Sequence, residues 1–420
     1  MSIRFCKNNI ACGSVTPPPS KSLLHRHIIC ASLCDKTTII SNVKLSQDVL
    51  ATIDCMRKLG ATITFDENYL TITGINQIVK IPEITFYCNQ SASTLRFLLP
   101  LSTLFCKNAK FQCHQSLLNR SLFPYKQCVA LHQDVVISDN NVCASGLILP
   151  GEYIIDASQS SQFVSGLLFT LPLLNGNSKI ILTGKLVSKA YLDMTVNVLT
   201  KHGIIIEETE YGFNINGNQR YLQYNCRIEN DFSQTAFFLI AGAISGKVTC
   251  DNINTDSIQG DKYIIDLLLK IGCNIKIENR SVTTFKTQPL TPFILDCDAY
   301  PDLALPLCVL AGTIMGESVF INTNRLKTKE SNRQAAIISL LTELGCNVTL
   351  KNENIHINGV PSFKSAIIDS RYDHRTAMST AIASLFCDGE IILLNENAVN
   401  KSYPDFYKDF EKIGGRFYVE

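Results

Sequence analysis

The segment Ser20-Lys21-Ser22-Leu23-Leu24-His25-Arg26-His27-Ile28-Ile29-Cys30 places a short polar triplet directly before an apolar run. This arrangement occurs six times in the 420 residues, and the last residues of successive triplets lie 69 to 73 positions apart. The six triplets are Ser20-Lys21-Ser22, Ser91-Ala92-Ser93, Ser160-Ser161-Gln162, Asp231-Phe232-Ser233, Tyr300-Pro301-Asp302 and Asp373-His374-Arg375. A repeat of this length indicates one supersecondary unit copied six times. We expect each triplet to begin a helix.

A glycine recurs in phase with the triplets, after a second predicted helix and before a β-rich run. These glycines are Gly60, Gly203, Gly272, Gly345 and Gly414. Glycine suits the position because helices commonly end in a left-handed residue. The second repeat lacks this glycine and has Leu131–Ile137 in its place.

The first repeat shows the order of elements within a unit. Helical spacing of apolar residues predicts helices over residues 23–33 and 47–59. Strands are expected over 37–43 and in a hairpin formed by 61–65 and 69–73. Each unit is therefore predicted to be a βαβαββ module of an α/β protein. Six modules of about 70 residues divide most naturally into two domains of three.

Composition excludes several classes of function. The formal net charge is +1, which argues against a nucleic acid or an anionic membrane as partner. No apolar stretch is long enough to cross a bilayer. The 17 cysteines are odd in number and form no Cys-x-x-Cys pair, so we expect reduced, buried thiols in a cytoplasmic protein rather than disulfides or a metal site.

Cations at predicted helix starts point to anionic ligands. Backbone N–H groups at a helix N-terminus attract anions and disfavour cations. Lys21, Arg96 and Arg375 nevertheless lie at or near three of these starts. We therefore expect an anionic ligand to offset the repulsion. No glycine-rich loop typical of ATP or dinucleotide binding is present.

Two further groups of residues allow both a structural and a chemical interpretation. Lys329, Glu330 and Arg333 precede a helix predicted over 335–344, and helical spacing would place them near one face. They could form an ordinary salt bridge or a ligand site. Asp302 could be an N-cap or a general base.

Together these segments resemble the enolpyruvylshikimate-phosphate synthase family, the 3-phosphoshikimate 1-carboxyvinyltransferases. The resemblance runs in order from Pro19-Ser20-Lys21-Ser22 to Lys401-Ser402-Tyr403-Pro404-Asp405. It implies an inside-out α/β barrel fold with two domains, residues 1–19 with 230–420 and residues 20–229, and an active site in the cleft between them. It also implies transfer of the enolpyruvyl group of phosphoenolpyruvate to the 5-hydroxyl of shikimate 3-phosphate. Neither cofactor nor metal is required, and we expect a monomer.

The resemblance also assigns roles to residues. Asp302 is expected to take the proton of the 5-hydroxyl, Glu330 to handle the proton at the methylene carbon, and Lys21 to assist catalysis. The residues expected to bind shikimate 3-phosphate are Lys21, Ser22, Arg26, Ser160, Ser161, Gln162, Ser188, Tyr191, Asp302 and Lys329. The residues expected to bind or shape the site of phosphoenolpyruvate are Lys21, Ala92, Ser93, Arg96, Gln162, Arg333, Arg375 and Lys401.

The chain departs from the family pattern at a few positions. Ala92 stands where the family usually has glycine, and its methyl group predicts tolerance to glyphosate. His25 replaces a small polar residue before Arg26. Arg120 is followed by Ser121 instead of the usual proline, which leaves the role of Arg120 open.

Two alternatives remain at this point. One is the sister enzyme, UDP-N-acetylglucosamine enolpyruvyl transferase, which relies on a loop cysteine. Cys113 has a suitable position, but its neighbours do not form the expected Gly/Pro-rich loop. The other is a non-catalytic anion-binding paralogue.

Overall fold

A computed structural model describes residues 2–6, 10–128, 133–138 and 141–420. The chain divides into two compact units, which we describe separately. Unit 1 contains residues 1–18 and 229–420, and unit 2 contains residues 19–228. The described residues form six four-stranded sheets, three in each unit.

One module of unit 1 shows the repeated topology. Its elements are β18 (Ile294–Asp296), α10 (Ala304–Gly312), β19 (Glu317–Ile321), η4 (Thr323–Thr328), α11 (Arg333–Glu343), β20 (Asn347–Lys351) and β21 (Asn354–Asn358). The strand order is β18-β19-β21-β20. The first pair is parallel and the other two are antiparallel. The predicted βαβαββ module is confirmed.

The N-terminal strands complete the other two modules of unit 1. The first contains β2 (Cys12–Val15), α8 (Phe232–Ser245), β15 (Lys247–Cys250), η3 (Gly260–Lys262), α9 (Tyr263–Lys270), β16 (Asn274–Glu278) and β17 (Ser281–Phe285). The other contains β22 (Ala366–Asp369), α12 (His374–Ala383), η5 (Ser384–Phe386), β23 (Ile391–Leu394), η6 (Glu396–Lys401), α13 (Phe406–Lys412), β24 (Phe417–Val419) and β1 (Ser2–Phe5). Thus β2 is parallel to β15, and β1 lies between β23 and β24.

The first sheet of unit 2 is completed in a similar way, by a strand from the C-terminal end of the same unit. Its first module contains β14 (Cys226–Arg227), α1 (Lys21–Ser32), β3 (Thr37–Ser41), α2 (Gln47–Lys58), β4 (Thr62–Asp66) and β5 (Tyr69–Thr73). The β14 strand pairs in parallel with β3. Local sequence patterns do not reveal this pairing because almost the whole unit separates the two strands.

The remaining modules of unit 2 differ in their second helices. The second module contains β6 (Ile81–Asn89), α3 (Ala92–Phe105), β7 (Cys106–Cys113), α4 (Gln115–Leu118), α5 (Phe123–Gln127), β8 (Gln133–Ser138) and β9 (Asn141–Gly146). The third contains β10 (Glu152–Asp156), α6 (Ser161–Thr170), η2 (Leu171–Leu173), β11 (Ser178–Thr183), α7 (Lys189–Lys201), β12 (Ile206–Thr209) and β13 (Gly212–Ile215). Two short helices replace the long second helix of the second module. Of Leu131–Ile137, residues 131 and 132 lie outside the described residues, and the rest belong to β8.

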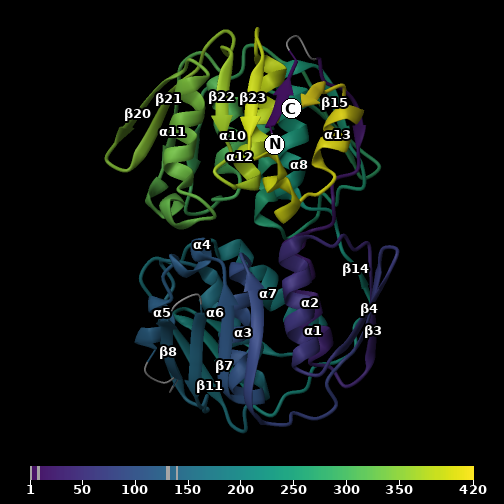
Figure 1. Ribbon diagram of the computed structural model, residues 1–420, viewed down its shortest axis with the longest axis vertical. Helices are drawn as coiled ribbons and strands as arrows, with labels where there is room; N and C mark the ends of the chain where they lie inside the picture. Colours follow the sequence, from purple (N-terminus) through teal and green to yellow (C-terminus); the bar gives the residue numbers. More distant parts are fainter. Residues whose placement is uncertain (1, 7–9, 129–132, 139–140) are drawn as a thin grey trace. The chain divides into compact units, whose positions relative to one another are not determined.

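The first helix of each module forms the interior of its unit. In unit 1, every residue of α8, α10 and α12 is buried, and the three helices contact one another. Figure 1 shows these helices inside the unit, with strands such as β22 and β23 further out. In unit 2, α1, α3 and α6 are buried along most of their length. The apolar runs that follow the triplets therefore make the cores.

The expected helix starts are confirmed at five of the six triplets. The residues that cap helices through their side chains are Ser20, Ser91, Ser160, Asp231 and Asp373. The fifth triplet differs, because α10 starts only at Ala304 and Leu303 precedes it without a side-chain cap. The interpretation of Asp302 as an N-cap is therefore wrong, and its carboxylate is left for other contacts.

The predicted glycine positions are confirmed at all five sites. Gly60, Gly203, Gly272, Gly345 and Gly414 each follow the C-cap residue of a helix, with φ between 79° and 111°. Residues other than glycine rarely adopt this conformation. Among the described residues, all 17 cysteines are free thiols, and 13 of them are buried. Within the same residues, the helices are too short or too polar to cross a membrane.

Candidate active site

Arg333 is the centre of a buried ion cluster in unit 1. It is the first residue of α11, and its side chain is 1% exposed. Its Nε lies 2.9 Å from Asp373 Oδ2, its Nη2 2.7 Å from Glu330 Oε2 and its Nη1 2.9 Å from Asp302 Oδ1. Burial opposes the charge of Arg333, but Asp373, Glu330 and Asp302 together raise its pKa. The guanidinium is therefore held as a permanent cation.

Asp302 joins Arg333 to Arg375. Arg375 Nη2 lies 3.3 Å from Asp302 Oδ2, and Nη1 donates to the backbone carbonyl of Asp302 at 3.0 Å. Burial alone would raise the pKa of the Asp302 carboxyl, but the charges of Arg375, Arg333 and Lys329 lower it well below its ordinary value. The Asp302 side chain retains 25% exposure. It is thus an ionised carboxylate that a ligand can reach.

Glu330 links Arg333 to a second cation. Its Oε1 lies 3.9 Å from Lys401 Nζ, and the Lys401 side chain is 5% exposed. Nearby, burial and the charge of Arg325 lower the pKa of Lys329 to about 7, although Asp302 and Glu330 oppose the shift. An incoming phosphate would favour the charged form of Lys329.

The predicted helical arrangement of this cluster is wrong. The α11 helix begins at Arg333 after the N-cap Asn332, so Lys329 and Glu330 precede it. Lys329 is instead the residue that follows η4. The contact between Glu330 and Arg333 exists, but the loop before the helix makes it.

Asp373 was missed as a partner by sequence reasoning. It caps α12 by accepting from the Arg375 backbone N–H at 2.9 Å, and its Oδ2 also accepts from Ser331 Oγ at 3.0 Å. It is fully buried. The Asp373 carboxylate therefore caps α12, which carries Arg375, and also holds the segment that contains Ser331 and Arg333. Only its place in a repeated triplet could have singled it out.

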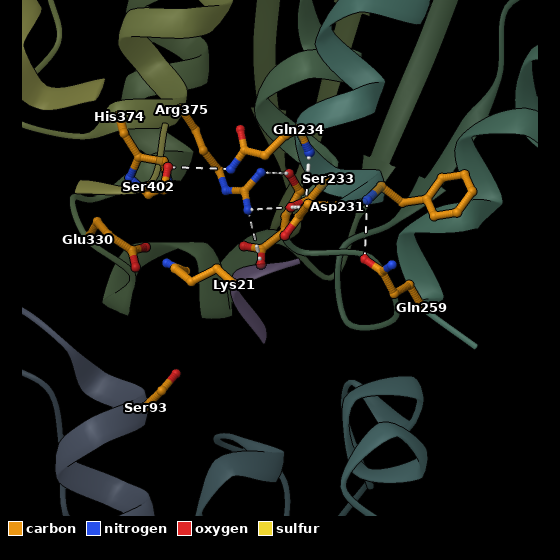
Figure 2. Close-up of polar contacts among 12 residues, drawn as sticks. Lys21, Ser93, Asp231, Ser233, Gln234, Gln259, Glu330, His374, Arg375 and Ser402 are labelled. Atoms are coloured by element: carbon orange, nitrogen blue, oxygen red, sulfur yellow. Dashed lines mark hydrogen bonds and ion pairs between the residues drawn. The ribbon is translucent and has the colours of Figure 1, made fainter. Parts of the chain in front are cut away.

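The start of α8 supports Arg375 from another side (Figure 2). Arg375 Nη2 donates to Ser233 Oγ at 2.9 Å, and Ser233 Oγ donates to Asp231 Oδ1 at 2.7 Å. Gln234 Nε2 donates to Ser402 Oγ at 3.4 Å, next to Lys401. The Asp231 triplet thus both caps its helix and helps to orient Arg375.

In unit 2, Arg26 is clamped between α1 and α7. Its Nε donates to Thr195 Oγ1 at 2.8 Å, and its Nη2 donates to the Tyr191 carbonyl at 2.9 Å. The third nitrogen, Nη1, donates to the Ser22 carbonyl at 2.6 Å. Burial lowers the pKa of Arg26 to about 10, so it remains charged at neutral pH. The structure thereby brings together three residues expected to bind shikimate 3-phosphate.

A second group in unit 2 joins the starts of α3 and α6. Gln162 Nε2 donates to Ser93 Oγ at 3.0 Å, while Gln162 Oε1 accepts from Arg96 Nη1 at 3.0 Å. Arg96 also donates to Ser160 Oγ at 3.4 Å. Ser161 begins α6 beside them, and Ala92 begins α3. Residues expected for both substrates are thus neighbours here.

The remaining predicted residues of unit 2 lie at the starts of α1 and α7. Lys21 Nζ lies 2.8 Å from Asp48 Oδ2. Ser188 precedes α7 in a left-handed conformation, with φ of 53°, which is uncommon for residues other than glycine or asparagine. Tyr191 lies in the first turn of the same helix.

At two of the three helix starts, a carboxylate of the chain itself balances the cation, so the expected need for an external anion is wrong there. Asp48 lies beside Lys21 and Asp302 beside Arg375, so carboxylates of the chain already offset these charges. Asp48 and Asp302 are distant from their partners in sequence, and spacing alone could not reveal them. Arg96 bonds to the uncharged side chains of Ser160 and Gln162.

Residues 7–410 match the model of the family described as EPSP synthase (3-phosphoshikimate 1-carboxyvinyltransferase). The chain belongs to this family. A 3-phosphoshikimate 1-carboxyvinyltransferase of Clostridium botulinum (strain Eklund 17B / Type B) is 39% identical over 415 residues, 97% of this chain and 96% of the relative. One of Clostridium perfringens (strain 13 / Type A) is 40% identical over 412 residues, 96% of each chain.

Solved structures support the EPSP synthase fold. An EPSP synthase from Acinetobacter baumannii superposes with a TM-score of 0.82 at 22% identity, over all of both chains. The enolpyruvyl transferase NikO from Streptomyces tendae superposes with a TM-score of 0.75 at 16% identity, over 99% of this chain and 98% of that one. The predicted α/β fold of the inside-out barrel type is confirmed. No group of three or more His, Cys, Asp or Glu side chains within the described ranges is arranged to hold a metal ion.

Proposed function

We propose that this chain transfers the enolpyruvyl group of phosphoenolpyruvate to the 5-hydroxyl of shikimate 3-phosphate and releases phosphate. Membership of the EPSP synthase family is the observation that carries this proposal. The reaction is a step of the shikimate pathway towards chorismate and the aromatic amino acids. Both substrates carry several negative charges, which suits the arginine and lysine side chains that the two units place at helix starts.

Shikimate 3-phosphate is proposed to bind through the groups around Arg26 and the start of α6. Arg26 is already fixed by Thr195 and by two backbone carbonyls, so little side-chain entropy would be lost on binding. Ser22, Ser160, Ser161, Ser188 and Tyr191 would add hydroxyl groups, and Lys21 and Lys329 would add positive charge.

Phosphoenolpyruvate is proposed to bind through four residues of unit 2, which are Lys21, Ser93, Arg96 and Gln162. From unit 1, Arg333, Arg375 and Lys401 would contribute the remaining positive charge. Arginine pairs well with carboxylates and phosphates because its N–H groups form a planar fork. Neutralising the leaving phosphate in this way would lower the barrier to breaking its C–O bond.

Proton transfer is proposed for Asp302 and Glu330. Asp302 would accept the proton of the 5-hydroxyl while the oxygen of that hydroxyl bonds to the enol carbon of phosphoenolpyruvate. Glu330, held between Arg333 and Lys401, would deliver and remove the proton at the methylene carbon. The bond between the enol carbon and the phosphate oxygen then breaks and phosphate leaves, so the enol carbon gains one C–O bond and loses another.

The contacts of Asp302 suggest how its basicity is controlled. Without substrate, Arg375 and Arg333 lower its pKa, which makes it a weak base. Anionic phosphoenolpyruvate competes with Asp302 for these arginines. Substrate binding would therefore raise the pKa of Asp302 at the point when a base is needed.

Ala92 is proposed to confer tolerance to glyphosate. It is the first residue of α3 and is buried beside Ser93, a proposed phosphoenolpyruvate ligand. Its methyl group leaves room for the natural substrate and would crowd the longer inhibitor.

We further propose that the enzyme acts as a cytoplasmic monomer. Sedimentation at 46.6 kDa would support a monomer, whereas a dimer mass would refute it. A UDP-N-acetylglucosamine transferase is disfavoured because Cys113 is buried at the end of β7 and not on a loop. Measuring phosphate release with shikimate 3-phosphate or with UDP-N-acetylglucosamine as acceptor separates these activities. Release with neither acceptor would favour the non-catalytic paralogue.

A further inference from the structure

Four buried side chains form a continuous hydrogen-bond chain across three helices of unit 2. His25 Nδ1 lies 2.7 Å from Thr52 Oγ1, Thr52 Oγ1 lies 2.7 Å from Thr94 Oγ1, and Thr94 Oγ1 lies 2.7 Å from Ser91 Oγ. All four residues are at most 1% exposed. We name this chain, from His25 through Thr52 and Thr94 to Ser91, the His25 relay. It is insulated from water along its whole length.

One end of the relay fixes the start of α3. Ser91 is the N-cap of this helix and accepts from the Thr94 backbone N–H at 3.3 Å. Ser93 and Arg96 follow in the first turns, where Gln162 joins them. A change in the orientation of Ser91 would therefore move two proposed ligands of phosphoenolpyruvate.

The other end fixes the register of α1 against α2. Lys21 and His25 are four residues apart on α1, and their partners Asp48 and Thr52 are four residues apart on α2. Residues at this spacing lie on the same helix face. The two contacts are therefore successive links between the same pair of helices. A single link would allow the helices to rotate, whereas two links one turn apart resist rotation.

The chemistry of His25 suits this position. Its Nε2 is buried and has no hydrogen-bond partner among the described residues, so Nδ1 makes its polar contact. Burial lowers the pKa of His25 to about 3, although Asp48 opposes the shift. A neutral imidazole in one tautomer would set the direction in which the three hydroxyl groups donate.

We propose that His25 is a positioning residue that acts through the His25 relay to hold Ser93 and Arg96 in place for phosphoenolpyruvate. This inference rests on the proposed function and adds a residue that does not itself touch a substrate.

A pair of substitutions separates positioning from simple packing. His25→Asn places a polar atom at the same number of bonds from the backbone as Nδ1, but leaves part of the volume empty. His25→Leu fills more of the volume and removes the hydrogen bond. If packing alone matters, Leu is the better replacement. If the relay matters, the His25→Asn variant binds phosphoenolpyruvate better than the His25→Leu variant, even if the Asn variant is the less stable protein.

The experiment is steady-state phosphate release with each substrate varied in turn, together with urea unfolding of every variant. We expect His25→Leu to raise the KM for phosphoenolpyruvate about tenfold, the effect of one lost buried hydrogen bond. The KM for shikimate 3-phosphate should change less than threefold, and His25→Asn should stay close to the wild type. Equal KM values for the Leu and Asn variants, or a better Leu variant, would overturn the inference.

Two threonine variants complete the test. Thr52→Val is nearly isosteric and breaks the middle of the relay, so it should reproduce the effect of His25→Leu. If the His25→Leu variant does not fold, the Thr52→Val variant decides the question. Thr170→Val is the matched control, because the Thr170 hydroxyl is buried and, among the described residues, bonds only to the Gly166 carbonyl of its own helix. It should leave both KM values unchanged. A wild-type protein without activity would instead refute the proposed function.

Discussion

Replacing Asp302 by Asn tests the proposed base while changing shape very little. The variant keeps the side-chain volume and loses the negative charge that lies 2.9 Å from Arg333 and 3.3 Å from Arg375. Arg333 retains Glu330 and Asp373 as partners, and Arg375 retains Ser233. The cluster should therefore persist, and the protein should fold.

The kinetic effect can be estimated from the proposed role. General base catalysis typically contributes about 10² to 10⁴ in rate, so we expect kcat to fall by about 10³, which corresponds to about 4 kcal/mol. Binding of phosphoenolpyruvate should be unchanged or tighter, because Arg375 and Arg333 no longer share their charge with Asp302. The Asp302→Ala variant should behave similarly.

Two measurements decide this prediction. Phosphate release gives kcat, and calorimetric titration in the presence of shikimate 3-phosphate gives the affinity for phosphoenolpyruvate. The reasoning is refuted if kcat remains within tenfold of the wild type. It also fails if affinity falls in parallel with kcat, because Asp302 would then act mainly by organising the arginines.

The remaining predictions address inhibition, stability and pH. Ala92→Gly should lower the glyphosate concentration that halves activity by at least tenfold, and an unchanged value would remove Ala92 as the cause of tolerance. Arg333→Lys should destabilise the protein by about 3 kcal/mol in urea unfolding, because the buried carboxylate of Asp373 and the partly buried ones of Asp302 and Glu330 lose the guanidinium that joins them. A change below about 1 kcal/mol would contradict this role. Arg4→Lys alters an exposed ion pair and is the control, which should leave the urea midpoint nearly unchanged. Burial lowers the pKa values of His27 and His202 to about 3 and about 4, so both are neutral in the folded state and gain protons on unfolding. Their stabilisation is complete above pH 6.5 and should decrease by about 2 kcal/mol for each imidazole by pH 5. A His27→Asn/His202→Gln double variant should lose this decrease in the free energy of unfolding between pH 6.5 and pH 5. A pH profile identical to that of the wild type would show that the two imidazoles do not cause the decrease.

Much of the fold could be predicted because its signals are local. Five of the six triplets set a helix start through a side chain of their own, and each C-terminal glycine is required by its own φ angle. The contribution of β14 to the first sheet of unit 2 could not be foreseen, because Cys226 and Ile40 pair across nearly the whole unit. With only two residues, β14 is also too short to show the alternating pattern of a strand.

The site residues were predictable as chemical types and not as contacts. Lys21 and Arg375 stood out because cations are disfavoured at helix starts, but the acids that balance them come from other elements. Asp48 lies on α2, and Asp302 precedes α10. Pairing between charges that are distant in the sequence depends on the tertiary fold. Cations that seem unbalanced in the local sequence therefore do not by themselves show that an external anion is needed.

The central claim is most directly tested by incubating the purified protein with phosphoenolpyruvate in the presence and absence of shikimate 3-phosphate. Phosphate release should require shikimate 3-phosphate and match, mole for mole, the appearance of its 5-enolpyruvyl ether by mass spectrometry. Absence of this ether, or phosphate release at the same rate without shikimate 3-phosphate, would contradict the proposed function.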